Sequence, residues 1–282
     1  MTTSDELQTW VGRQEIADDI LTPRRYASAA ATLDKDMKWP EPGTPLPPAW
    51  YWIYFTPLMP TSTLADDGHE ALGRFLPPVD LPRRMWAGGR IEFLAPLLVG
   101  EASQRVSTVK TITEKQGKSG RLVFVLVEHR ILSGDRLCVR EEQDIVYREA
   151  PRQGAVAPEP PVAPSAADFS QTISPTPNLL FRYSALTFNT HKIHLDRDYC
   201  RGVEGYPGLV VHGPLLATLL LELVRDNLPD AQVARFSFRA VSPLFDTGDF
   251  TVNGRRIGEN KVELWAANHD GGLATSAEVE LA

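Results

Sequence analysis

Three of the six histidines lie in one stretch, Phe181 to Leu223, which also holds the strongest helix-start signal of the chain. His191 and His194 stand in a polar turn, and His212 follows at the end of a glycine-rich segment. Imidazole has an unperturbed pKa close to neutral pH, so it can take or give a proton under ordinary conditions. The stretch is therefore a candidate site for acid-base chemistry.

A helix is predicted to begin directly after these histidines. Gly213-Pro214 suits a helix start, because proline lacks an N–H that would be unpaired there and its φ is already helical. The residues that follow, through Leu223, are apolar on nearly every side, which is typical of a helix inside the core. Its N-terminus offers unpaired N–H groups and a positive dipole end to an anion or to a polarised carbonyl oxygen.

The motifs of this stretch, FNTHKIHLD followed by GLVVHGPLL, resemble the MaoC-like, or R-specific enoyl-CoA hydratase, branch of the hotdog-fold proteins. By this resemblance His194 falls on the catalytic histidine of the family and Asp196 on the acid two residues later. Gly213 falls on the glycine whose backbone N–H helps to hold the thioester oxygen. Asn189 falls where the family has its catalytic aspartate.

The longer segment FRYSALTFNTHKIHLDRDY, with VEGYPGLVVHG, is most similar to one subgroup of that family. The subgroup includes 3-methylfumaryl-CoA (mesaconyl-C4-CoA) hydratase, itaconyl-CoA hydratase and the 3-hydroxyacyl-thioester dehydratases, in which asparagine is normal at the position of Asn189. The resemblance extends into the first half through LPRRMWAGGRIEF and EEQDIVYR. It implies a hydro-lyase that adds or removes water across the double bond of an enoyl-CoA thioester, without a metal or redox cofactor.

Each residue of the motif has an expected role in such a reaction. His194 is expected to transfer the proton, and the Gly213 N–H to hold the oxyanion. Asn189 cannot act as a base, but its amide can orient water or the thioester. His212 is expected to cap or pack at the helix start, beside the substrate. His191 and His194 form an H-x-x-H pair without a carboxylate or cysteine at a known spacing, which is a weak metal signal.

Candidate substrate-binding residues also lie outside the histidine motif. Arg83 and Arg84, followed by Trp86 and two glycines, are able to hold an anion in bidentate fashion, or they form a surface pair beside a turn. A dicarboxylic acyl group such as mesaconyl needs a cation near the far end of its pocket. Arg182, Arg83 and Arg84 are the candidates for that cation.

Composition limits the alternatives. The chain has 282 residues, 43% hydrophobic and 23% charged, and a net charge of −7. This charge argues against a nucleic-acid surface, which needs a basic face. No run is long enough to predict a membrane span, and the N-terminus shows neither a signal peptide nor a transit peptide, so the cytoplasm is expected. The two cysteines, Cys138 and Cys200, do not make a disulfide framework.

The order of the elements predicts an α+β fold, a double hotdog in which two antiparallel sheets each wrap a helix. Residues 4–36 are predicted to be helical, and alternating strands follow from Arg90. The expected domains are a degenerate, non-catalytic hotdog at 1–149, a Pro/Ala-rich linker at 150–167 and a catalytic hotdog at 168–282. The two sheets are expected to join edge to edge, as in a homodimer of single hotdogs. A homodimer of whole chains is an open alternative.

Two other functions stay open at this stage. The same thioester pocket would suit a hotdog thioesterase, and a chain without the usual aspartate would suit a non-catalytic acyl-CoA-binding partner. The histidine motif occurs once, which predicts one active site per chain. The only histidine in the matching part of the first half, His69, is expected to be solvated. The aromatic run at 49–55 is expected to pack in the core or to form a wall of the acyl pocket.

Overall fold

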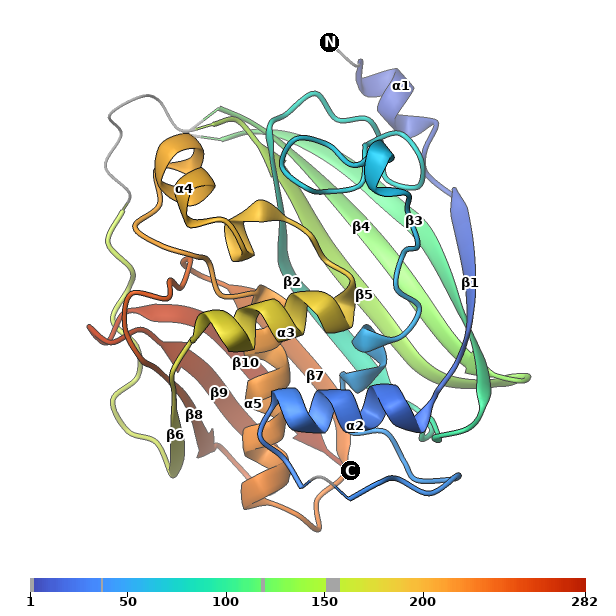
Figure 1. Ribbon diagram of the computed structural model, residues 1–282, viewed down its shortest axis with the longest axis vertical. Helices are drawn as coiled ribbons and strands as arrows, with labels where there is room; N and C mark the ends of the chain where they lie inside the picture. Colours follow the sequence, from blue (N-terminus) through green and yellow to red (C-terminus); the bar gives the residue numbers. More distant parts are fainter. Residues whose placement is uncertain (1–2, 37, 118–119, 151–157) are drawn as a thin grey trace.

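One antiparallel sheet of ten strands runs through the protein, in the order β1-β3-β4-β5-β2-β7-β10-β9-β8-β6 (Figure 1). The computed structural model describes residues 3–36, 38–117, 120–150 and 158–282. The strands of the first half are β1 (Gln14–Ile20), β2 (Arg83–Phe93), β3 (Ala102–Gly117), β4 (Gly120–Ser133) and β5 (Arg136–Arg148). Those of the second half are β6 (Phe169–Ile173), β7 (Val233–Ala240), β8 (Phe250–Arg256), β9 (Lys261–Ala267) and β10 (Leu273–Leu281).

The two halves meet where β2 pairs with β7, with Gly88 opposite Arg239 and Gly89 opposite Phe238. A Cβ atom on Gly88 would lie 2.5 Å from the carbonyl oxygen of Phe238, so only glycine allows this approach of the two backbones. The expectation that the sheets join edge to edge is confirmed. The glycine pair after Trp86 belongs to a strand, and the expected turn at this point is wrong.

The helices are unequally shared between the halves. The longest, α5 (Gly213–Asn227), is buried along most of its length and packs against β6, β8, β9 and β10, as its apolar sequence predicts. In the first half, α2 (Pro23–Thr32) packs against α3 (Pro177–Thr187) and the short helix η1 (Trp50–Ile53). No helix among the described residues is both long and apolar enough to cross a membrane.

The prediction of helix throughout residues 4–36 is wrong, because the edge strand β1 separates α1 (Ser4–Gln8) from α2. Gly12 turns the chain with φ +87, and its N–H donates to Val109 O at 2.8 Å. The strand then pairs with β3 along its whole length. This pairing joins residues about ninety positions apart, so the local sequence pattern does not reveal it.

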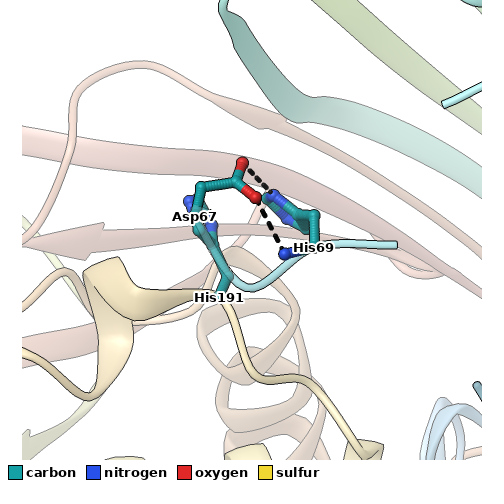
Figure 2. A group of neighbouring side chains, drawn as sticks. All are labelled: Asp67, His69 and His191. Atoms are coloured by element: carbon teal, nitrogen blue, oxygen red, sulfur yellow. Dashed lines mark hydrogen bonds and ion pairs between the residues drawn. The ribbon is translucent and has the colours of Figure 1, made fainter. Parts of the chain in front are cut away.

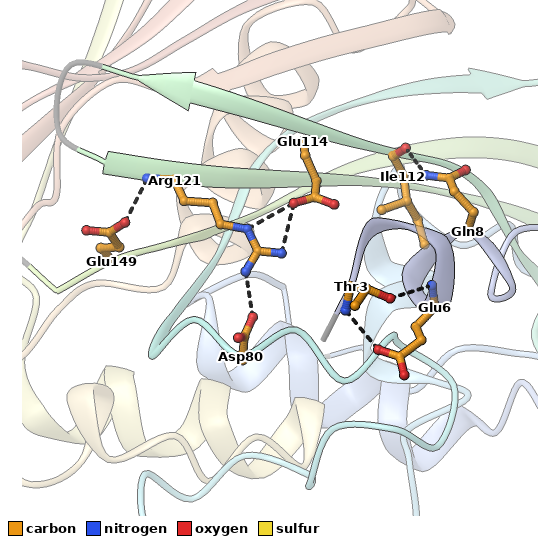
Figure 3. A network of polar contacts seen from close by, with 8 residues as sticks. All are labelled: Thr3, Glu6, Gln8, Asp80, Ile112, Glu114, Arg121 and Glu149. Atoms are coloured by element: carbon orange, nitrogen blue, oxygen red, sulfur yellow. Dashed lines mark hydrogen bonds and ion pairs between the residues drawn. The ribbon is translucent and has the colours of Figure 1, made fainter. Parts of the chain in front are cut away.

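Polar contacts attach the N-terminal segment and the following loops to the sheet (Figure 3). The helix α1 begins with a capping box in which Thr3 and Glu6 bond each other's backbone N–H groups, and Gln8 Nε2 donates to Ile112 O at 2.9 Å. Arg121 on β4 bonds Asp80 at 2.6 Å and Glu114 at 2.9 Å. The loop before β2 is thus held against the β3–β4 hairpin.

The proline-rich linker expected at 150–167 falls partly on residues 151–157, which lie outside the described residues. The part that follows is attached to the second half. Val162 forms a bridge with Gly272, and the Leu273 N–H donates to Pro161 O at 2.7 Å. The domain boundaries at 149 and 168 remain a prediction. In the sheet, strands β1 to β5 lie on one side of the β2–β7 junction and β6 to β10 on the other.

Candidate active site

A cavity of about 240 Å³ lies between the two halves at the start of α5. Its walls come from the first half through Tyr51, Trp52, Phe55, Trp86, Arg105, His129, Glu141 and Gln143, and from the second half through Tyr183, Thr187, Asn189, His212 and Pro214. The aromatic run at 49–55 thus packs in the core and also forms part of the cavity wall. Trp50 and Tyr54 are buried in the core, whereas Tyr51, Trp52 and Phe55 line the cavity.

His194 is buried beside this cavity and held in one orientation. Its Nδ1 lies 2.7 Å from Val210 O, an acceptor only, so Nδ1 carries the proton and Nε2 keeps its lone pair. The ring stacks on His212, with centroids 3.7 Å apart and planes at 19°. Burial lowers the pKa of His194 to about 4, so the imidazole is neutral at pH 7 and able to accept a proton.

His212 is placed at the N-cap of α5 and also lines the cavity. Its Nε2 lies 2.8 Å from the Ser184 hydroxyl, and its buried Nδ1 has no hydrogen-bond partner among the described residues. Burial and the neighbouring His194 lower its pKa well below the usual value. The residue was expected to cap or pack, and the structure adds a buried ring nitrogen without a hydrogen-bond partner among the described residues.

His191 continues the row of rings away from the cavity. It meets His194 edge-on, with centroids 5.5 Å apart, and lies 3.8 Å from the ring of His69. The expectation that His69 is solvated is therefore wrong. Its ring is largely buried, its Nδ1 bonds Asp67 Oδ2 at 2.9 Å, and burial lowers its pKa (Figure 2). Local sequence could not show this, because the contact with His191 is between the two halves.

Asp67, His69 and His191 are also the described residues best placed to hold a metal ion. One ligand atom from each lies within 4.8 Å of the others (Figure 2). Imidazole nitrogen and carboxylate oxygen suit zinc and several transition metals. However, both Asp67 oxygens already accept hydrogen bonds, from the His69 backbone N–H at 2.9 Å and from its ring. The Asp67 carboxylate and the His69 Nδ1 thus bond each other, and His194 is not part of the group.

Asn189 and Gly213 both lie at the cavity end of the second half. Asn189 lines the cavity, and its Oδ1 accepts the His191 N–H at 2.9 Å. Because its acceptor oxygen is engaged, the side-chain NH₂ is the group left to bond a ligand. Gly213 is the first residue of α5, and a Cβ atom there would meet nothing within 4 Å. The helix therefore starts beside open space, with its N-terminal N–H groups unpaired within the helix.

The expected arginines are not cavity residues. Arg83 pairs with Glu204 at 2.8 Å and lies over the Tyr206 ring, so a partner within the protein satisfies its charge. Arg182 is exposed on α3, where its guanidinium reaches Ala31 O at 3.4 Å. Neither these residues nor Arg84 are among the residues that line the cavity, whereas Trp86 is. The expectation that Arg84 binds an anion of the substrate stays a prediction.

The strands β4 and β5 contribute the cavity residues His129 and Glu141, which an alternating sequence pattern does not single out. Ser107, His129 and Glu141 are cross-strand neighbours on β3, β4 and β5. His129 bonds the Ser107 hydroxyl at 2.8 Å, and burial lowers its pKa to about 3. Burial raises the pKa of Glu141. In the sequence, a charged residue at an inward position of an alternating strand could have indicated Glu141 as a cavity residue. Arg105 stands at such a position as well.

Comparisons with known proteins agree with this geometry. The family model for hydroxyacyl-thioester dehydratase type 2 matches residues 49–246. A protein of Chloroflexus aurantiacus named mesaconyl-C(4)-CoA hydratase is 46% identical over 280 residues, which cover 99% of each chain. The family and this relative are hydro-lyases by name, so the chain is a hydro-lyase rather than a thioesterase or a non-catalytic binding protein.

Solved structures show the same fold. A MaoC-like dehydratase of Phytophthora capsici superposes with a TM-score of 0.67 at 14% identity, covering 99% of each chain. A Mycobacterium tuberculosis protein described as having a double hotdog fold gives a TM-score of 0.59 at 13% identity, covering 96% of each chain. The expected double hotdog is thereby confirmed, and the chain belongs to the hydroxyacyl-thioester dehydratase type 2 family of MaoC-like hotdog proteins.

Proposed function

We propose that the protein hydrates a mesaconyl-type enoyl-CoA, whose β-carbon carries a carboxylate, and dehydrates the hydroxyacyl product in reverse. The observation that carries this proposal is the neutral, oriented His194 stacked on the cavity residue His212 at the start of α5. A neutral imidazole with a free nitrogen suits proton transfer at pH 7. The named activity of the Chloroflexus relative, which aligns along nearly the whole chain, supports the acyl group.

In the proposed reaction, each group of the site has one role. His194 Nε2 takes a proton from water as the oxygen adds to the β-carbon, and the electron pair of the double bond moves toward the thioester oxygen. The Gly213 N–H and the positive end of α5 stabilise that developing charge. The Asn189 NH₂ group orients water or the thioester. Return of the proton from the imidazolium to the α-carbon completes the addition, so no net proton is consumed.

The test is turnover by the purified protein on three thioesters, mesaconyl-C4-CoA, itaconyl-CoA and crotonyl-CoA. Hydration removes the ultraviolet absorbance of the conjugated enoyl group without releasing free thiol. We expect the highest kcat/KM with mesaconyl-C4-CoA. Release of thiol without loss of the enoyl group would contradict the proposal, and so would the absence of turnover on all three compounds.

Three further expectations from the sequence stay predictions. The carrier is CoA, and its phosphates are candidate ligands for Arg84. The chain works in the cytoplasm. A homodimer is an open alternative to a monomer, and light scattering on the purified protein will distinguish the two.

A further inference from the structure

Arg105 is the cationic side chain in the cavity wall, and it is unpaired. It projects from β3 into a wall that also contains Phe55, whose ring centroid lies 5.9 Å from the guanidinium carbon. Among the described residues, none forms a hydrogen bond or ion pair with this guanidinium, and its Nε is buried without a partner. Arg105 is partly buried, and the desolvation of a cation without a hydrogen-bonded partner is costly.

Glu141 is the carboxylate in the same wall, but its oxygens are already occupied. They accept from the Tyr51 hydroxyl at 2.8 Å, from Trp52 Nε1 at 3.1 and 3.2 Å, and from Gln143 Nε2 at 2.8 Å. Glu15, which pairs with Arg74, and Glu141 both act on the charge of Arg105 through space, but neither forms an ion pair with it among the described residues. Burial also raises the pKa of Glu141. The guanidinium donors therefore remain available to a ligand in the cavity.

The rest of the cavity determines what kind of ligand this is. Asn189 and His212 line the cavity near the start of α5, where the proposed function puts the thioester, and Trp52 and Trp86 add apolar surface to the cavity wall. Burial lowers the pKa of His129 to about 3, so this histidine brings no second positive charge. A ligand that satisfies the site is a short acyl thioester with one anionic oxygen pair at its far side, matched to the planar guanidinium.

We propose that Arg105 binds the carboxylate on the β-carbon of a dicarboxylic acyl thioester and thereby selects such substrates over monocarboxylic ones. This inference rests on the proposed function, because it places the thioester at the start of α5. It replaces Arg182, Arg83 and Arg84 as the candidates for the distal carboxylate. Fork-shaped pairing in a dry cavity makes the carboxylate contact strong, and a methyl group at the same position would leave the guanidinium unpaired.

The experiment compares two saturated thioesters that cannot be hydrated. Succinyl-CoA carries a carboxylate on its β-carbon, and butyryl-CoA carries a methyl group there. By calorimetry, we expect the wild-type protein to bind succinyl-CoA at least about 10-fold more tightly, the size expected for a hydrogen-bonded charge. Arg105→Met should abolish that preference and leave the butyryl-CoA affinity within about 3-fold. Arg105→Lys, with charge but no fork, should give an intermediate preference.

Arg130→Met is the matched control, since Arg130 lies on the neighbouring strand β4 and is exposed. It should keep the full preference for succinyl-CoA. Loss of an unpaired buried cation should not lower the unfolding midpoint, so Arg105→Met should fold normally. In turnover, the same variant should lower kcat/KM for mesaconyl-C4-CoA by about 10²-fold and for crotonyl-CoA by less than about 3-fold.

Two results would overturn the role of Arg105. One is a wild-type protein that binds both thioesters equally, and the other is an Arg105→Met variant that weakens both to the same extent. Failure of the proposed function is a separate result. If the wild type prefers succinyl-CoA through Arg105 but hydrates none of the enoyl thioesters, the carboxylate site stands and the hydratase activity falls.

Discussion

The imidazole of His194 is neutral at pH 7 because burial holds its pKa at about 4, and its orientation is fixed by Val210 O. We therefore expect His194→Ala to lower kcat by about 10²-fold or more, the usual size of a general acid-base contribution. The free-enzyme pH profile of kcat/KM should stay level from neutral pH downward and fall only as pH approaches 4, where the base gains a proton. Steady-state kinetics on mesaconyl-C4-CoA measure both.

The control is His269→Ala, because His269 is an exposed histidine outside the cavity. Its kcat should equal that of the wild type. Near-normal turnover by His194→Ala would remove this residue from the proton-transfer step. His212, with its unpaired Nδ1 beside the cavity, would then be the next base to replace.

Asn189 presents donors rather than an acceptor to the cavity, since its Oδ1 is bonded to the His191 N–H. Asn189→Ala should reduce kcat less than His194→Ala does, because orientation by one neutral amide contributes less than proton transfer. Asn189→Asp should retain measurable activity, since a carboxylate oxygen can still accept the His191 N–H. The kcat values of the three variants provide the comparison, and a fully active Asn189→Ala enzyme would make the residue a bystander.

At the scale of elements, the β2–β7 junction is a tightly constrained contact between the halves. A Cβ atom on Gly88 would lie 2.5 Å from Phe238 O, and backbone atoms cannot move aside as a flexible side chain can. We expect Gly88→Ala to reduce the free energy of unfolding by more than about 2 kcal/mol, as in other overpacked sites. Denaturant titration measures this change.

Gly202→Ala is the matched control for the junction variant. A Cβ atom on Gly202 meets nothing within 4 Å, and its φ is not in the left-handed region. Its unfolding midpoint should remain close to that of the wild type. Equal stability of the two alanine variants would show that β2 and β7 can separate without cost.

The junction and the edge strand also show where element prediction fails. The alternation that predicts strands starts at Arg90, whereas β2 already starts at Arg83, where the arginines and glycines favoured a turn. The edge strand β1 lies within the segment predicted to be helical. It depends on the backbone of β3, and its Ile16 and Ile20 are exposed. Both elements are stabilised by partners distant in sequence. Helix α5 needed no such partner to be predicted, because its apolar surface and its proline start are local.

For the molecule as a whole, the cavity of about 240 Å³ is lined by both halves and includes His212 of the histidine motif. We expect butyryl-CoA to bind with a stoichiometry of one per chain by calorimetry. Two equivalent sites would contradict the asymmetric arrangement. Since His69 contacts His191 across the halves, His69→Ala is expected to alter kcat modestly, and the stoichiometry is the cleaner test.

Burial of histidines also makes the stability of the whole fold depend on pH. The pKa values of His69, His129, His191, His194 and His212 are all lowered, chiefly by burial. The unfolded chain therefore binds more protons than the folded one below the ordinary histidine pKa near 6.5, and stability falls as pH falls toward the folded values. We expect the thermal midpoint to drop by about 5 °C or more from pH 7.5 to pH 5.5.

The variant that tests this dependence is His129→Asn, which keeps a polar partner for Ser107 and removes one buried titrating group. The slope of the midpoint against pH should become shallower. His269→Asn should leave the slope unchanged, because His269 is exposed. A midpoint that does not vary between pH 5.5 and 7.5 would contradict the assignment of these histidines as buried and neutral.

The sequence by itself determined the family, the double hotdog and the segment that bears His194, Asn189 and Gly213. These features are local, since a motif, an apolar helix and alternating strands are each written in neighbouring residues. Only the tertiary structure decided what faces them. Arg105 and Asp67 come from the first half, and they reach the cavity or the histidine row through strand register and the packing of the two halves. Contacts of that kind depend on distant parts of the chain, which no local pattern specifies.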